Sequence, residues 1–123
     1  MSKPTSGIAV DGACSGNPGL AEYKIVDIAT GKTLVQRKIG IATNNHAEFI
    51  GLCHALHAYR DVPIYCDSIT AIAWVRNKKA NSKHPHPDVG RCEEMLKKVD
   101  YKYEIIKWDT KKHGEIPADF GRK

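Results

Sequence analysis

The sequence lacks any apolar stretch long enough to cross a bilayer, and Met1-Ser2-Lys3-Pro4 is not followed by the apolar core of a secretion signal. It also lacks internal repeats and low-complexity segments. These absences argue against a membrane-spanning, repetitive or largely disordered protein. We therefore expect a cytoplasmic globular protein with no membrane partner.

Closely spaced cysteines are missing as well. The four cysteines are Cys14, Cys53, Cys66 and Cys92, with no Cys-x-x-Cys pair and no Cys/His cluster at the spacing of zinc sites. Each stands among apolar neighbours, as a small hydrophobic residue would. We expect reduced, mostly buried thiols, as in an intracellular protein.

The composition is that of an ordinary globular domain with a basic surface. The chain has 123 residues, of which 41% are hydrophobic and 27% charged, which is enough for one domain over residues 1–123 with its own core. Nineteen Lys and Arg against fourteen Asp and Glu give a net charge of +5. This balance favours a polyanionic partner, although a merely solvated basic surface explains it equally well. A monomer is expected.

The first part of the chain predicts three antiparallel strands. Alternating apolar residues place them at 7–14, 21–28 and 33–41, with turns at 15–19 and 30–32. These connections are short, so the strands should form a meander. The third strand alternates apolar and polar residues, as an outer strand does.

The second part of the chain alternates helices and strands. We predict a helix over 45–60 with Asn44 or Asn45 as its N-cap, a strand at 63–66 and a helix over 68–77. A helix capped by Asp88, a strand at 103–108 and a short helix over 117–122 follow. This order predicts an α/β fold: a mixed five-stranded sheet, made of the meander plus two parallel strands, with flanking helices.

Four acidic residues stand at the ends of predicted elements: Asp11, Glu48, Asp67 and Asp119. If the first and fourth strands are parallel neighbours, Asp11 and Asp67 lie side by side, and a helix packed across them brings Glu48 close. A turn or capping role is the alternative for each acid alone. Clustered carboxylates either take up protons or hold cations. Oxygen ligands suit Mg²⁺ or Mn²⁺, and two such ions roughly 4 Å apart serve phosphodiester hydrolysis.

The sequence around these acids resembles the motifs of type 1 ribonuclease H. The matching segments are 10–19 (VDGACSGNPG), 42–49 (ATNNHAEF) and 65–68 (YCDS), and 106–123 looks like the fourth acidic motif in its short bacterial form. The resemblance covers essentially the whole chain. It implies a ribonuclease H-like fold and a single catalytic domain without a preceding hybrid-binding domain.

The resemblance implies an endoribonuclease that cuts the RNA strand of RNA–DNA hybrids and leaves 3′-hydroxyl and 5′-phosphate ends. Asp11 would bridge two Mg²⁺ or Mn²⁺ ions, Glu48 and Asp67 would complete the site nearer the leaving group, and Asp119 would hold the ion nearer the attacking water. Glu115 falls where such relatives carry a mobile acid linked to product release. His113 is the competing candidate, and a solvated loop position is the alternative for both.

The resemblance also implies six contacts with the hybrid, made by Asn17, Thr43, Asn44, Asn45, Trp74 and Ser82. The amides would contact the two strands near the minor groove, Thr43 and Ser82 would hold a DNA phosphate, and Trp74 would pack on a deoxyribose. Turn and cap chemistry is the alternative for the amides, and core packing is the alternative for Trp74.

Three lysines, Lys78, Lys79 and Lys83, add positive charge near the implied phosphate pocket. Two positions depart from the family pattern. Ile69 replaces a polar residue that contacts RNA, and Lys83 stands where a hydroxyl often completes the pocket. These departures concern binding rather than chemistry.

Two other functions fit parts of the pattern. A nuclease or strand-transferase of the same fold would share the carboxylates but act on DNA. A catalytically idle module would bind hybrids or dock on another protein. A requirement for ribonucleotides would exclude the first, and the presence of all four acids argues against the second.

Overall fold

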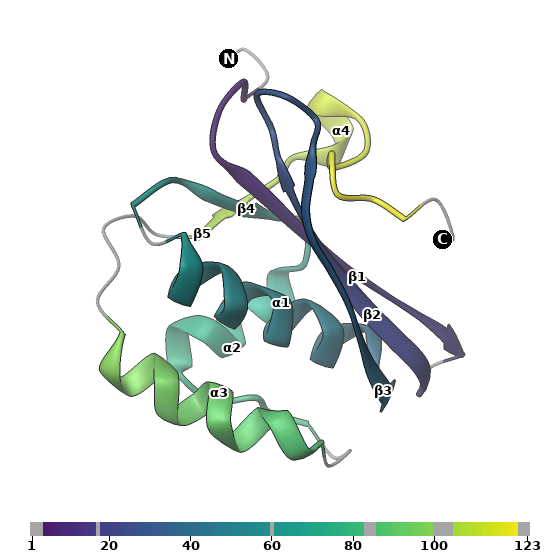
Figure 1. Cartoon of the computed structure of the whole chain (residues 1–123), viewed down its shortest axis with the longest axis vertical. Helices are drawn as coiled ribbons and strands as arrows, with labels where there is room; N and C mark the ends of the chain where they lie inside the picture. Colours follow the sequence, from purple (N-terminus) through teal and green to yellow (C-terminus); the bar gives the residue numbers. More distant parts are fainter. Residues whose placement is uncertain (1–3, 17, 60, 83–85, 100–104, 121–123) are drawn as a thin grey trace.

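The computed structural model describes residues 4–16, 18–59, 61–82, 86–99 and 105–120 (Figure 1). Its elements, in chain order, are β1 (Ile8–Gly16), β2 (Gly19–Asp27), β3 (Thr33–Ala42), α1 (Asn44–Ala58), β4 (Ile64–Cys66), α2 (Ile69–Asn77), α3 (Pro87–Lys98), β5 (Ile105–Lys107) and α4 (Thr110–His113). Within these ranges, no helix combines the length and the apolar character that a membrane span requires.

The strands form one mixed sheet in the order β3-β2-β1-β4-β5. β1 pairs antiparallel with β2, and β2 pairs antiparallel with β3. β1 pairs parallel with β4, and β4 pairs parallel with β5. The predicted five-stranded fold, with its meander and two parallel strands, is therefore confirmed.

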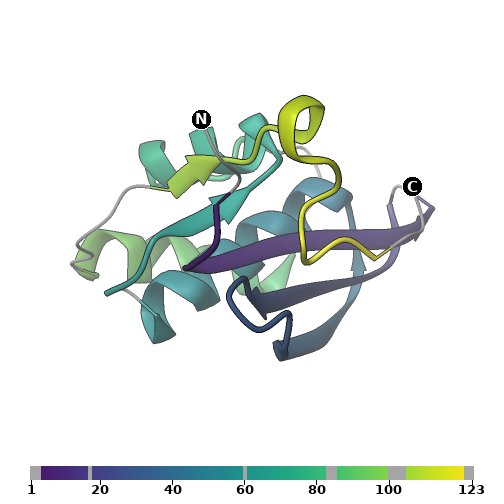
Figure 2. The ribbon, with the colours of Figure 1, turned by 90° about the horizontal axis from the view of Figure 1, so that it is seen from above.

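The two faces of the sheet are covered differently. The helices α1, α2 and α3 lie together along one face, whereas α4 and the segment after it pass along the other (Figures 1 and 2). Successive side chains of β1 point to opposite faces of the sheet. Val10 packs in the large core under the helices, whereas Ala9 packs with Val26 and Trp108 in a smaller cluster on the other face. Ile116 and Ala118 complete the smaller cluster.

Glycines allow α1 to approach the sheet very closely. A Cβ at Gly12 would lie 2.7 Å from Ala47 Cβ and 2.8 Å from the backbone nitrogen of Glu48. A Cβ at Gly51 would lie 2.8 Å from Val10 Cγ1. Strand and helix therefore each contribute a glycine to the contact, and this contact places Glu48 directly beside β1.

Two helix caps differ from the prediction. Thr43, not Asn44 or Asn45, is the N-cap of α1, and its hydroxyl accepts from the backbone N–H of His46 at 3.1 Å. His86, not Asp88, is the N-cap of α3. Pro87 occupies the first helical position, where a missing N–H costs nothing, and this leaves Asp88 inside the first turn.

The end of the chain also differs from the prediction. Residues 117–120 of the expected helix over 117–122 form a turn and an irregular segment, and the rest of that range lies outside the described residues. Ile116 and Ala118 are buried while Pro117 between them is half-buried, so this segment packs with an alternating rather than a helical pattern. A short helix, α4, forms earlier instead, with Asp109 as its N-cap. In the predicted last strand, residues 103 and 104 lie outside the described residues.

Candidate metal and nucleic-acid site

The pairing of β1 with β4 brings two of the acids together. Val10 is the register partner of Cys66 in this parallel pair. Asp11 and Asp67 are the next residues along the two strands, and β4 ends at Cys66. The two carboxylates thus leave neighbouring strands at the carboxyl end of β4, where neighbouring loops diverge and ligand sites form in such sheets.

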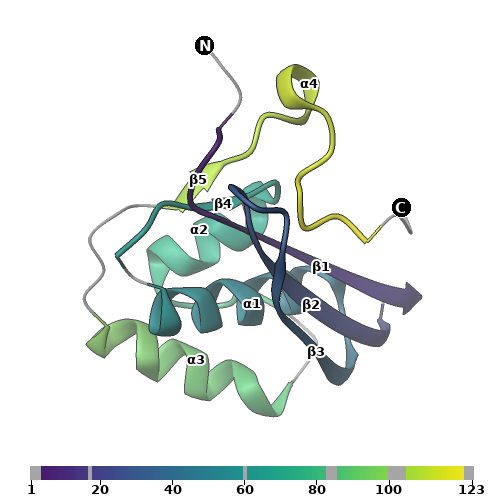
Figure 3. The ribbon, with the colours of Figure 1, turned by 45° about the horizontal axis from the view of Figure 1, so that its top comes forward.

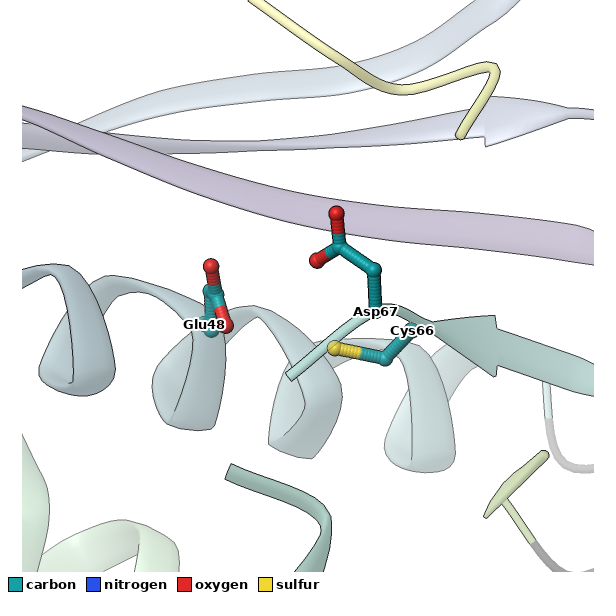
Figure 4. A group of neighbouring side chains, drawn as sticks. All are labelled: Glu48, Cys66 and Asp67. Atoms are coloured by element: carbon teal, nitrogen blue, oxygen red, sulfur yellow. The ribbon is translucent and has the colours of Figure 1, made fainter. Parts of the chain in front are cut away.

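Glu48 joins this position from α1. Glu48, Cys66 and Asp67 each offer one ligand atom, and these atoms all lie within 4.8 Å of one another. Figure 4 shows the carboxylates of Glu48 and Asp67 beside β1, with the Cys66 sulfur close by. Because Glu48 lies over Gly12, the residue after Asp11, the helix brings its acid to the same point of the sheet.

The electrostatics place Asp11 in the same group. Burial raises the pKa of the Cys66 thiol well above its usual range, and the negative charges of Glu48, Asp67 and Asp11 raise it further. Asp11 is fully buried, and Glu48 is only 6% exposed. Three carboxylates therefore surround one buried thiol, in a position where negative charge is costly without a nearby cation.

Asp119 reaches this region through the segment after α4. Lys24 is the register partner of Asp11 on β2, and its Nζ donates to the backbone carbonyl of Asp119 at 3.2 Å. The same Nζ lies 4.8 Å from the centre of the Phe120 ring. Lys24 thus holds the backbone of Asp119 near β2 and β1, where the segment after α4 passes in Figure 3.

The donor set fits a hard divalent cation. Carboxylate oxygens are the ligands that Mg²⁺ and Mn²⁺ prefer, and Asp11, Glu48 and Asp67 supply them from a strand, a helix and a strand end. Cys66 is a poor ligand for such ions, because it is soft and its raised pKa keeps it protonated. Sequence reasoning missed both Cys66 and Lys24, although the register of the first hairpin would have revealed Lys24 opposite Asp11.

Of the residues expected to contact a hybrid, Thr43, Asn44 and Asn45 lie at the start of α1, and Ser82 lies beyond α2. Thr43 is buried with its hydroxyl engaged in the helix cap, Asn44 is exposed and Asn45 is half-buried. Ser82 is half-buried, and its backbone N–H donates to the carbonyl of Ala80. Asn17 lies outside the described residues. The structure thus places three of these side chains along the first turn of α1 and its cap.

Trp74 lies within the core. It is 8% exposed and packs edge-on against Phe49 with ring centres 5.8 Å apart. Ile69, at the start of the same helix, is 72% exposed. Lys78 caps the end of α2 with a left-handed backbone conformation, and both it and Lys79 are exposed, whereas Lys83 lies outside the described residues. The end of α2 therefore offers positive charge to solvent.

The two candidates for the mobile residue differ in their surroundings. Glu115 is exposed. His113 is half-buried and packs edge-on against Trp108 at 5.5 Å, while the Trp108 indole N–H donates to the carbonyl of Gly114 at 2.9 Å. Packing therefore restrains His113 more than Glu115.

The comparisons with known proteins agree on one family. The sequence model of the family described as RNase H matches residues 4–112. A ribonuclease H of Neorickettsia sennetsu (strain ATCC VR-367 / Miyayama) is 34% identical in an alignment of 89 residues; the match covers 61% of this chain and 59% of that protein. The match thus spans less than two thirds of that relative.

Solved structures share the fold. LC11-RNase H1, solved in complex with an RNA/DNA hybrid, matches with a TM-score of 0.58 and 22% identity over 86% of each chain. RNase H1 from the halophilic archaeon Halobacterium salinarum NRC-1 matches with a TM-score of 0.55 and 28% identity, over 81% of this chain and 82% of that one. These likenesses support the fold described above.

Proposed function

Because this chain belongs to the RNase H family, as its sequence motifs predicted, we propose that it is an endoribonuclease that hydrolyses the RNA strand of RNA–DNA hybrids. The observation that carries the proposal is the carboxylate cluster, in which ligand atoms of Glu48 and Asp67 lie within 4.8 Å beside Asp11. LC11-RNase H1, which shares the fold, was solved with a hybrid bound. An acidic cluster in a basic chain also suits a polyanionic substrate held by metal.

Four residues would hold two Mg²⁺ or Mn²⁺ ions. In this proposal Asp11 would contribute to both ion positions, Glu48 and Asp67 to one, and Asp119 to the other. When bound, such ions activate a water and stabilise the leaving oxygen of an in-line displacement, which here would leave 3′-hydroxyl and 5′-phosphate ends. Lys24 is a positioning residue in this scheme, because it holds the backbone of Asp119. Exposed Glu115 is the better placed of the two candidates for assisting product release.

The hybrid would lie across the start of α1 and the end of α2. We assign its contacts to Asn17, Thr43, Asn44, Asn45, Trp74 and Ser82. Lys78 and Lys79 would add a sequence-independent attraction for phosphates. Burial limits Trp74 to contact through the part of its ring that reaches the surface. We further propose that one domain and one monomer suffice for the reaction.

The activity is tested with labelled RNA–DNA hybrid, double-stranded RNA, double-stranded DNA and single-stranded RNA. Each is incubated with Mg²⁺, with Mn²⁺ or with chelator, and the products are resolved on a gel. We expect metal-dependent cutting confined to the RNA strand of the hybrid. Equal cutting of DNA would instead indicate a DNA-acting nuclease of the same fold, and hybrid binding without cutting would indicate an idle module.

The site assignment is tested with Asp67→Asn. This change keeps the shape of the side chain but removes the charge that holds a cation, so turnover should fall by at least about 100-fold. Hybrid binding at low salt should stay measurable, because the nucleic-acid surface is intact. Asp61→Asn is the matched control, since Asp61 is exposed and precedes β4. Undiminished cleavage by Asp67→Asn would refute the assignment.

A further inference from the structure

Two cysteines meet on the helical face of the sheet, where they play no part in the carboxylate cluster. Cys53 lies in α1 and Cys92 in α3, and both line a cavity of about 300 Å³. Tyr23, Arg37, His54 and Arg91 also line this cavity. It therefore brings a pair of thiols together with two guanidinium groups.

The two thiols lie close together in this cavity. Hydrogen bonding between their side chains shifts the pKa of both Cys53 and Cys92, and both residues carry free thiols. Cys53 is 2% exposed and belongs to the large core, whereas Cys92 is half-buried at its border. A reagent entering from solvent would therefore meet Cys92 before Cys53.

The surroundings give the two thiols different reactivities. The hydrogen bond from Cys53 lowers the pKa of Cys92, Arg91 lowers it further, and burial and the charge of Asp88 oppose these effects. The same hydrogen bond, together with burial, raises the pKa of Cys53. Since the thiolate is the nucleophile in thiol–disulfide exchange, Cys92 is the attacking group.

We propose that Cys53 and Cys92 are a reversible oxidation site that forms a disulfide between α1 and α3 by exchange with a low-molecular-weight disulfide. The Cys92 thiolate attacks one sulfur of the small disulfide, breaks its S–S bond and releases one half as a thiolate. The Cys53 thiol gives its proton to that thiolate and then attacks Cys92 Sγ, which releases the second half. Two protein thiols are oxidised, and the small disulfide is reduced to two thiols.

The other two cysteines lack this arrangement. Cys66 is fully buried, and the neighbouring carboxylates disfavour its thiolate. Cys14 is half-buried at the end of β1, beside the cluster of Ala21, Ala42 and Ala47. Neither lines the cavity that holds Cys53 and Cys92. Cys14 therefore serves as an internal comparison for simple surface reactivity.

The test exposes the full chain to a series of oxidised and reduced glutathione mixtures, followed by alkylation, intact mass measurement and peptide mapping. We expect a species lighter by two hydrogen atoms, a peptide linking Cys53 to Cys92, and reversal by dithiothreitol. The midpoint of thermal unfolding should rise on oxidation, because the link constrains the unfolded chain. None of these readouts depends on nuclease activity.

Single variants separate the two roles. Cys53→Ser should accumulate glutathione on Cys92, because the resolving thiol is gone, whereas Cys92→Ser should leave Cys53 unmodified. The proposal would be overturned if the wild-type chain gained glutathione on Cys14 under conditions that leave Cys53 and Cys92 unlinked. Because that result comes from the unaltered protein, it decides the question even if a variant fails to fold.

Discussion

Gly12 follows Asp11 in β1 and has the first turn of α1 packed against it. A Cβ at this position would meet a backbone nitrogen at 2.8 Å, so the helix itself would have to move. Gly12→Ala should therefore lower the free energy of unfolding by about 1–3 kcal/mol, as overpacking does. The substitution should also lower turnover, because Glu48 belongs to α1 and would be displaced with it. Urea unfolding and hydrolysis assays measure the two effects.

Gly90→Ala is the matched control for this change. Gly90 lies within α3, and nothing stands within 4 Å of a Cβ added there. The same substitution should raise the free energy of unfolding by about 0.5–1 kcal/mol, because alanine favours a helix over glycine. If Gly12→Ala were as stable as the wild type, the close contact between β1 and α1 would not require glycine at this position.

Single residues also mark the limit of what the sequence predicts about the site. The four acids were predicted as site residues from their places at element ends and from the motifs around them. Cys66 was interpreted only as a buried thiol, because its sequence neighbours are apolar. Its closeness to the Glu48 carboxylate results from the packing of α1 on the sheet, which the sequence around Cys66 does not reveal. The role of Lys24 depends on the path of the segment that carries Asp119, and no local pattern encodes that path.

Among the elements, β2 and α1 are joined by a polar contact inside the helical core. Tyr23 Oη lies 2.5 Å from His54 Nδ1. Burial lowers the pKa of His54, and Arg37 and His57 lower it further, while burial raises the pKa of Tyr23. Both shifts favour the neutral form of each group, so the contact joins an uncharged imidazole and an uncharged phenol.

This contact should make the fold sensitive to mild acid. The folded pKa of His54 lies below the ordinary histidine value of 6.5, so the unfolded chain binds the proton more readily. The contribution of neutral His54 to the free energy of unfolding is complete above the unfolded pKa, and it is lost as the pH falls through the folded pKa. Unfolding by urea at about pH 7.5 and about pH 5.5 should show lower stability at the acid pH, by more in the wild type than in His54→Gln.

His57→Gln is the control for that measurement. His57 lies one turn further along α1 and is exposed. His57 is the smallest of the three influences that lower the pKa of His54, so this variant should keep most of the acid sensitivity of the wild type. An acid response that disappears in His57→Gln but persists in His54→Gln would assign the effect to the wrong histidine and contradict the prediction.

At the same scale, hydrophobic periodicity predicted the elements better than their ends. The strands and the first three helices follow from repeating apolar positions, which packing on the sheet preserves. The N-cap position depends on competition between adjacent polar residues. The observed caps, Thr43 and His86, lie one or two residues before the predicted ones. The segment carrying Asp119 has few apolar residues, and its form is set by burying Ile116 and Ala118 on the far face of the sheet.

For the molecule as a whole, a net charge of +5 coexists with a buried acidic cluster. The positive charge outside attracts a polyanion, while the acids inside repel one another. The site is therefore expected to reduce the stability of the metal-free fold. Under the proposed function, catalysis and stability place opposite demands on the same residues, as is common where charge is concentrated for catalysis.

This conflict predicts how metal and mutation change the thermal midpoint. A cation that binds only the folded state stabilises it, by about 2.7 kcal/mol at a hundredfold excess over its dissociation constant, so Mg²⁺ or Mn²⁺ should raise the midpoint by several degrees. Asp67→Asn should raise the midpoint of the chelator-treated protein, because one repelling charge is gone, and should weaken the response to Mg²⁺. Asp61→Asn should leave both unchanged.

Sodium chloride at matched ionic strength separates binding at the cluster from general screening, since screening acts on the whole surface and binding acts on the four acids. If sodium chloride reproduced the effect of Mg²⁺ in the wild type and in Asp67→Asn alike, the carboxylates would not be acting as a cation site. A response to Mg²⁺ that requires Asp67 would show that the cluster binds metal before any substrate is present, and it would do so without reference to turnover.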